Sequence, residues 1–234
     1  MEIVGLLYGQ NKLNYLKLNS MKFYTIYIAT LIMCNCTSVY EKKVIVSQPR
    51  IDTIRKDIPQ SLDGSLNAQY LLKDSAEKKA GFQTMENGFD SLKIRFWFGY
   101  VFTDKEQVIE IEFVNNKWNG TLFNLSNAYN SNYDSVITLK REVSNIIPRS
   151  GWAKFTEELF NLDVLTLPSW EAIPKYTLDS DASSINVQIA TKNMYRIYFY
   201  PSPSSNEQIL EAKKINKIIR LLQDELGFKL IRNI

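Results

Sequence analysis

Alternating apolar and polar positions run through most of the second half of the chain. Apolar side chains recur at every second position in residues 94–102 and again in residues 109–113, where glutamates fill the alternate positions. A period of two places alternate side chains on the same face of a β-strand. The pattern predicts these two strands, a returning strand over residues 118–125, a weaker strand over residues 136–143, and a hairpin over residues 185–199.

The turn after residue 113 is predicted from its asparagines. Asn115-Asn116-Lys117 separates two apolar runs, and asparagine tolerates the positive φ that a tight hairpin needs. Asn119-Gly120 is a rival turn with suitable dipeptide chemistry. We prefer the earlier turn because it leaves two arms of similar length. Gly120 is then expected to be a bulge or a site of close contact.

Helical periodicity follows these strands. Residues 152–162 carry apolar side chains at helical spacing, and Ser150 precedes them as the predicted N-cap. Residues 210–226 carry a longer apolar stripe that ends at Gly227, a residue suited to the positive φ of a helix C-terminus. Ser204 and Glu207 have the spacing of a capping box and predict where this last helix begins.

A third helix is predicted more weakly over residues 65–80, capped by Ser65 and ended by Gly81. Its apolar stripe is thin, so a surface helix or disorder are the alternatives. Hairpins followed by segregated helices indicate the α+β class. We expect a single α+β domain over residues 89–234, with an antiparallel sheet of hairpins and two main helices packed on one face. Residues 37–88 are polar and irregular, and they predict a tether.

An apolar run near the beginning of the chain predicts export from the cytoplasm. Met21 and Lys22 precede about a dozen apolar residues, and the run ends at Cys34-Asn35-Cys36 before Thr37-Ser38. A cation, a short apolar stretch and a boundary of small residues make up a secretory signal peptide. The run is short for a membrane span, which needs roughly 20 residues. Residues 1–20 then read as a spurious upstream extension, with translation starting at Met21.

The leader over residues 21–36 resembles the signal of bacterial lipoproteins, of the looser Bacteroidota type. In that family a cysteine becomes the first residue of the mature chain and carries acyl groups. We take Cys36 as the lipidated residue, with Cys34 as the alternative. The resemblance implies a protein of the bacterial cell envelope, facing the periplasm or the cell surface and held to a membrane by its N-terminal lipid. An uncleaved anchor, plain secretion and a cytosolic protein are the other interpretations.

Composition narrows the chemistry. The chain of 234 residues is 45% apolar and carries a net charge of +3, which favours a globular protein and does not indicate a nucleic-acid partner. It contains no histidine, so a Ser-His-Asp triad and a typical catalytic zinc site are excluded. Both cysteines belong to the leader, so the domain has no internal disulfide and no cysteine zinc site. We assign no catalytic residue, no metal ligand and no cofactor, and we favour a protein without enzymatic activity.

Two sets of residues are candidates for function. Glu110 and Glu112 share one face of a strand and could act as a pair of hydrolase carboxylates, although a solvated strand face is the simpler interpretation. Arg196, Tyr198 and Tyr200 make a polar and aromatic row on another strand, and Trp170 lies between two prolines in a loop. These four residues form our candidate binding surface, because tyrosine, arginine and tryptophan are enriched at binding hot spots. The alternatives are a covered strand face and a buried loop anchor.

Three functions follow from these observations. The first is a membrane-anchored binding or accessory module for an envelope protein or a glycan. The second is an envelope inhibitor or immunity-type protein that blocks an enzyme or toxin. The third is a hydrolase that relies on carboxylates without histidine.

Overall fold

The computed structural model describes residues 53–61, 64–99, 105–129, 136–179 and 183–230. The predictions for the upstream extension and for the leader, with Cys34 and Cys36, lie outside these residues. The same holds for residues 100–102 at the end of the first predicted strand.

A seven-stranded sheet organises the domain, in the order β1-β7-β6-β2-β3-β4-β5. Every neighbouring pair is antiparallel except β1 and β7, which run parallel. The strands are β1 (Arg55–Asp57), β2 (Leu92–Gly99), β3 (Lys105–Val114), β4 (Lys117–Tyr129), β5 (Val136–Asn145), β6 (Ser184–Thr191) and β7 (Met194–Pro201).

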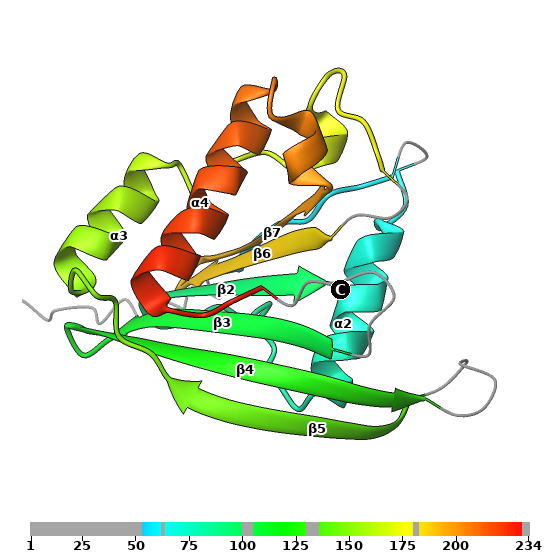
Figure 1. The fold of residues 1–234 in the computed structure, drawn as a ribbon. Coiled ribbons are helices and arrows are strands. Elements are labelled where there is room, and N and C mark those ends of the chain that lie inside the picture. Colours follow the sequence, from blue (N-terminus) through cyan, green and yellow to red (C-terminus); the bar gives the residue numbers. More distant parts are fainter. Residues whose placement is uncertain (1–52, 62–63, 100–104, 130–135, 180–182, 231–234) are drawn as a thin grey trace, which may run out of the picture. The chain divides into compact units, whose positions relative to one another are not determined.

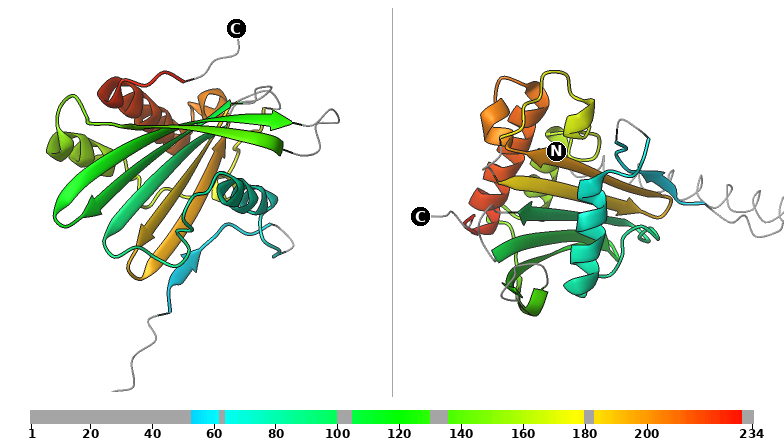
Figure 2. Two further views of the ribbon diagram at one scale, coloured as in Figure 1. Left: turned by 90° about the horizontal axis from the view of Figure 1, so that it is seen from below. Right: turned by 90° about the vertical axis from the view of Figure 1, so that its right-hand side faces the viewer.

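Helices cover both faces of this sheet. Helices α3 (Trp152–Asn161) and α4 (Leu210–Leu226) lie on one face, and α2 (Ala68–Lys79) lies on the other (Figures 1 and 2). We call these the α4 face and the α2 face. The α+β class, the antiparallel sheet of hairpins and the two main helices on one face are thereby confirmed, and α2 is an addition on the opposite face.

The α4 face holds the largest apolar core. Alternate residues of four strands, including Ile94, Ile109, Val187 and Tyr198, are fully buried there, and Ile218 of α4 packs into the same cluster. In this layer, the apolar face that the strands form by alternation packs against the apolar stripe of α4, and each buries the other.

The α2 face is buried too, but its core is partly charged. Apolar residues such as Trp97, Phe123 and Phe199 pack there beneath α2. The stripe that α2 turns to the sheet includes Lys73 and Glu77, both buried. This explains why the sequence of α2 shows only a thin apolar stripe. Both β1 and α2 fall within the stretch that we interpreted as a tether, and they pack as part of the folded domain.

The predictions for the β3–β4 hairpin, its turn and Gly120, are confirmed. The turn between β3 and β4 is Asn115-Asn116, with φ of 51° and 60°, as a two-residue hairpin turn requires. Gly120 lies in an uninterrupted stretch of the β3–β4 register. A Cβ placed on it would lie 2.7 Å from Trp152 and 2.8 Å from Ile146, so it is a close-contact site and not a bulge.

The predicted N-caps of the two main helices are wrong. The N-cap of α3 is Gly151, at φ 83°, and the main-chain N–H of Ser150 donates instead to Glu225 of α4. Helix α4 begins after Ile209 without a side-chain cap. Ser204 lies in a separate 3₁₀ turn, Pro203–Asn206, which the neighbouring proline starts by fixing its own φ.

Of two other predicted helix ends, one is wrong and one is confirmed. Helix α2 is capped by Asn67, whose side-chain oxygen accepts from the N–H of Gln69 at 2.7 Å, so the Ser65 cap is also wrong. Asparagine and serine are equally favourable N-caps, and the helix begins at Asn67, two residues after Ser65. Gly227 ends α4 at φ 68°, as predicted.

Candidate functional site

A row of alternating charges crosses the α2 face and leads from the interior to the surface. It consists of Glu77 on α2, Arg95 and Lys93 on β2, and Glu110 and Glu112 on β3. Side-chain exposure rises along it from 1% at Arg95 to 33% at Glu112. We call these five residues the charged row. Each cation lies between two carboxylates, so the row is internally compensated and carries one excess negative charge.

Arg95 is the buried centre of the charged row. Its guanidinium lies 2.6 Å from Glu110 and 2.9 Å from Glu77. It also donates to the side-chain oxygen of Gln188 at 3.3 Å and to the main-chain oxygen of Gln83 at 3.1 Å. Burying a charge is costly unless ion pairs and hydrogen bonds compensate it. The four contacts supply this compensation and join α2, the segment after it, and three strands.

Lys73 on α2 is buried close to Arg95, and the half-buried Glu106 on β3 is its electrostatic neighbour. The ammonium of Lys73 lies over the ring of Trp97, and in the described part of the chain its Nζ has no hydrogen-bond partner. Burial lowers the pKa of Lys73 well below its usual value, against the opposing attraction of Glu77 and Glu106. Burial raises the pKa of Glu106, although Lys73 and a hydrogen bond from Trp97 oppose that shift. Lys73 is not among the residues that line the pocket described next, and we assign it no chemistry.

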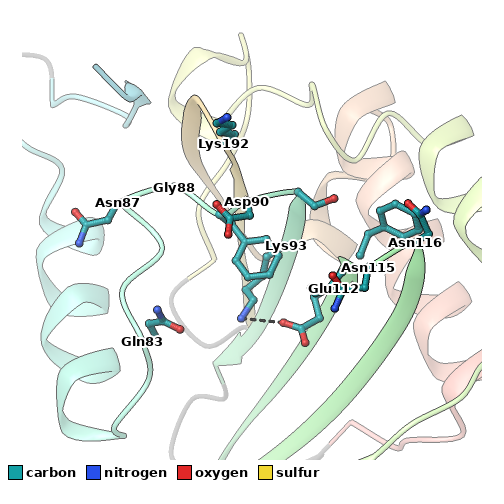
Figure 3. A pocket seen from close by; sticks show the side chains of 13 residues that line it. Gln83, Asn87, Gly88, Asp90, Lys93, Glu112, Asn115, Asn116 and Lys192 are labelled. Atoms are coloured by element: carbon teal, nitrogen blue, oxygen red, sulfur yellow. Dashed lines mark ion pairs between the residues drawn. The ribbon is translucent and has the colours of Figure 1, made fainter. Parts of the chain in front are cut away.

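A pocket of about 680 Å³ opens where the charged row meets the surface. Three segments line it: the connection from α2 to β2 together with Lys93 of β2, residues 112–116 around the β3–β4 turn, and Lys192 of the β6–β7 turn. Figure 3 shows the ion pair of Lys93 and Glu112, 3.0 Å long, between these segments.

Most of the pocket wall is amide and charge. Asn115 and Asn116 lie on one side, and Gln83 and Asn87 on the other (Figure 3). Lys93 and Lys192 balance Asp90 and Glu112 in charge. The lining also contains Phe89 and Phe113; the Lys93 ammonium lies 4.7 Å from the Phe89 ring, and Phe113 packs against Trp118.

The walls of this pocket are held by main-chain contacts. The N–H of Phe89 donates to Thr191 at 2.9 Å, and a Cβ on Gly88 would meet the carbonyl oxygens of Thr191 and Lys192 at 3.0 Å. Gly88 also has φ of 79°, so both space and conformation require glycine there. The two-residue turn holds Asn115 and Asn116. The backbone that carries the polar groups is thus positioned before any ligand arrives, which lowers part of the entropic cost of binding.

Arg196, Tyr198 and Tyr200 lie on the α4 face beneath the segment that follows α3. Arg196 donates to the carbonyl oxygens of Leu165 and Leu167, Tyr198 donates to Val164 at 2.8 Å, and Tyr200 donates to Pro168 at 2.7 Å. The two tyrosines are fully buried, and burial raises both of their pKa values. The covered-face alternative therefore describes this row, whose polar atoms fasten a loop to the sheet.

Trp170 lies in a 3₁₀ turn, Trp170–Ala172, and is half-buried against the apolar cluster that contains Tyr70 and Phe199. Its ring centroid is 6.0 Å from that of Tyr176. The indole nitrogen is buried and has no hydrogen-bond partner in the described part of the chain. The structure thus places it as a loop anchor, away from the residues that line the pocket.

Glu110 and Glu112 do lie on one face of β3, and both are ion-paired; Glu110 is largely buried, whereas Glu112 is partly exposed. Both contact Lys93, at 3.9 and 3.0 Å, and Glu110 also pairs with Arg95. Neighbouring carboxylates on one strand do not face each other across a scissile bond, as hydrolase chemistry needs. Among the described residues, no group of three or more His, Cys, Asp or Glu is arranged to hold a metal ion.

Sequence reasoning missed the charged row and the pocket. The available signal was Lys93 and Arg95 at alternate positions of an otherwise apolar strand, opposite Glu110 and Glu112 on the next strand. Charges inside an apolar strand are rarely left unpaired.

The comparisons with known proteins add no identity. No protein-family model matches the chain, and no curated protein is similar to it. None of the helices in the described residues is both long and apolar enough to cross a bilayer.

Proposed function

We propose that this protein is a lipid-anchored module of a bacterial cell envelope that binds a glycan in the pocket between Gln83 and Lys192. One observation supports the proposal most: a pocket with a fixed backbone, lined by amides and by two charges of each sign. Each amide offers a donor and an acceptor side by side. Hydroxyl and acetamido groups of a sugar chain have the same dual character, so they match such a wall.

The charge balance favours an uncharged ligand. Lys93 is already paired with Glu112 at 3.0 Å, so a ligand anion would have to compete with a neighbouring carboxylate. Asp90 and Lys192 add one charge of each sign to the same lining. A strongly acidic or basic ligand would have to displace a partner from the Lys93–Glu112 pair, whose lysine is largely buried. A neutral saccharide requires no such exchange.

The leader supports the location. Residues 21–36 have the pattern of a lipoprotein signal, and an acylated Cys36 would hold the domain close to envelope glycans. Anchoring raises the effective concentration of a weak binding site near its ligand, so a shallow polar pocket with modest affinity would suffice.

Binding is tested by titrating the full-length protein in detergent with oligomers of β-1,4-linked N-acetylglucosamine and with polysaccharide from the envelope. The Asn115→Gly/Asn116→Gly variant removes two pocket amides, and glycine keeps the positive φ of the turn. We expect its dissociation constant to rise about ten-fold or more, equivalent to ~1.4 kcal/mol. Lys217→Ala on α4, which removes an exposed lysine on the opposite face, is the matched control.

The outcomes separate the hypotheses. Loss of glycan binding in the pocket variant but not in the control supports the proposal. Capture of an envelope enzyme or toxin through the same pocket, without glycan binding, would favour the inhibitor hypothesis and contradict ours. The anchor is tested separately by labelling cells with a palmitate analogue. Label should be lost in Cys36→Ser and kept in Cys34→Ser, and unlabelled wild-type protein would refute the anchoring.

A further inference from the structure

Strand β5 forms a long open edge of the sheet. It is the last strand in the sheet order, and among the described residues it is hydrogen-bonded to β4 alone. Figure 1 shows it as the outermost strand. The opposite edge is the three-residue strand β1, whereas β5 has ten residues, and residues 140–145 are all exposed. An edge of this length is a template for pairing with another strand.

The register shows which main-chain groups face outward. The N–H of Ile146 donates to Gly120 at 3.0 Å, and Thr121 lies opposite Asn145. In an antiparallel ladder, hydrogen-bonded and non-hydrogen-bonded pairs alternate. Even-numbered residues of β5 therefore point their N–H and C=O groups toward β4. The main-chain groups of Arg141, Val143 and Asn145 point away from it and are available to a new strand.

We propose that two copies of this protein pair through their β5 strands, antiparallel and about a two-fold axis at Arg141. In this register Lys140 of each copy lies opposite Glu142 of the other. The contact therefore places two opposite-charge pairs at non-hydrogen-bonded positions, where side chains are closest. They extend the ion pair that Lys140 and Glu142 already form within each copy, at 2.7 Å. Val143, 58% exposed, then lies opposite position 139, which is a leucine in the sequence.

Alternative two-fold registers are less favourable. An axis at position 142 places Glu142 opposite itself, and an axis at position 140 places Lys140 opposite itself; like charges directly opposite are destabilising. An axis at Val143 places Lys140 opposite position 146 and Glu142 opposite position 144, neither of which is charged. The two charges then keep only the ion pair that they form with each other within one chain, at 2.7 Å. Charges on an edge strand obstruct most strand pairings. Here they favour one register, the one with its axis at Arg141.

In this register Arg141 lies opposite its counterpart in the other copy, but its own contacts within the chain hold each guanidinium away from the contact. Its guanidinium stacks on Phe82 and Phe123, 4.6 and 4.4 Å from their ring centroids. It also donates to the carbonyl oxygens of Ala80 and Gly81 at 3.1 and 3.3 Å. These contacts draw the side chain inward over the α2 face, and its main-chain groups remain available at the edge.

Charge reversal tests the register. Sedimentation velocity of the full-length protein in density-matched detergent measures how many polypeptides each particle holds across about 1–100 µM. We expect a dimer for the wild type. Lys140→Glu and Glu142→Lys each replace both attractive pairs by repulsive ones, so each should raise the dimer dissociation constant about ten-fold or more. The double variant restores opposite charges and should dimerise as the wild type does.

Lys213→Glu, an exposed charge reversal on α4, is the control and should remain dimeric. A monomeric wild type at 100 µM overturns the proposal. Dimerisation that ignores both single variants, or a double variant that stays monomeric, overturns it equally. Since Lys140 and Glu142 are exposed, the folding of each variant can be verified by circular dichroism. The pocket and the leader do not enter this test.

Discussion

Replacing Arg95 by methionine tests the central electrostatic claim of this structure. Methionine keeps most of the length and the apolar volume of the side chain but has no charge. The substitution removes the ion pairs with Glu110 and Glu77 and the hydrogen bonds to Gln188 and Gln83. It leaves Glu77 buried on α2 without its ion-pair partner, and the nearby Lys73 is itself a buried amine with a lowered pKa.

The expected cost follows from these contacts. Breaking a buried ion pair by removing one partner costs about 3–5 kcal/mol, because the other charge stays buried without compensation. Urea unfolding of a domain this size has a slope of about 2 kcal/mol per M. A loss of about 4 kcal/mol therefore lowers the midpoint by about 2 M. This is a large part of the roughly 5–15 kcal/mol that stabilises a typical domain.

The measurement is equilibrium urea unfolding followed by tryptophan fluorescence and far-UV circular dichroism. Lys217→Met is the matched control, because it also exchanges a cation for methionine but on the exposed side of α4. Its midpoint should stay near that of the wild type. Adding Glu77→Gln to Arg95→Met should recover part of the loss, since a neutral amide costs less to bury than a carboxylate. An Arg95→Met variant within about 1 kcal/mol of the wild type would refute the assignment of Arg95 as the compensating centre.

Two further predictions concern the buried faces. Ile218→Asp should unfold the domain, because it places a carboxylate in the fully buried interface of α4 with the sheet; a thermal melt equal to that of the wild type would contradict this packing. Lys73→Met should remove a pH dependence. Burial lowers the pKa of Lys73 in the folded protein, whereas unfolded lysine titrates near ~10.4. Between the two pKa values the unfolded state binds more protons, so the free energy of unfolding of the wild type should rise with pH up to about 10. Urea midpoints at several pH values should show a flatter profile for Lys73→Met, and an unchanged slope would count against a buried, unpaired amine.

Much of the fold follows from short-range patterns. The strands of β2, β3, β6 and β7, the hairpin turn at Asn115 and the C-terminus of α4 at Gly227 all depend on residues within a few positions of one another. Turn chemistry and side-chain periodicity act over the same distance. Helix N-termini were harder to predict. Near each of Ser65, Ser150 and Ser204 another residue can begin the helix, and which one does depends on the geometry of the adjoining loop.

The candidate site could not be found in this way. The partners in this cluster are far apart in the sequence. Arg95 and Gln188, which are hydrogen-bonded, are separated by 93 positions, and Glu77 and Glu110 come from two further elements. Their meeting requires α2 to pack on the face opposite α4, and the polar stripe of α2 gave little sign of this. Conversely, Arg196, Tyr198 and Tyr200 were candidates because they are polar and aromatic, yet carbonyl groups from the loop after α3 satisfy all three.

The sequence by itself therefore determined the strands, the amphipathic helices, the α+β class and the leader pattern, because each depends on side chains that are neighbours along the chain. Only the tertiary structure decided which polar residues are buried partners, which are loop anchors and which line a pocket. Burial and ion pairing depend on segments that are distant in sequence and adjacent only after the sheet is covered on both faces. The open edge at β5 has the same origin, since a strand is an edge only with respect to the order of the whole sheet.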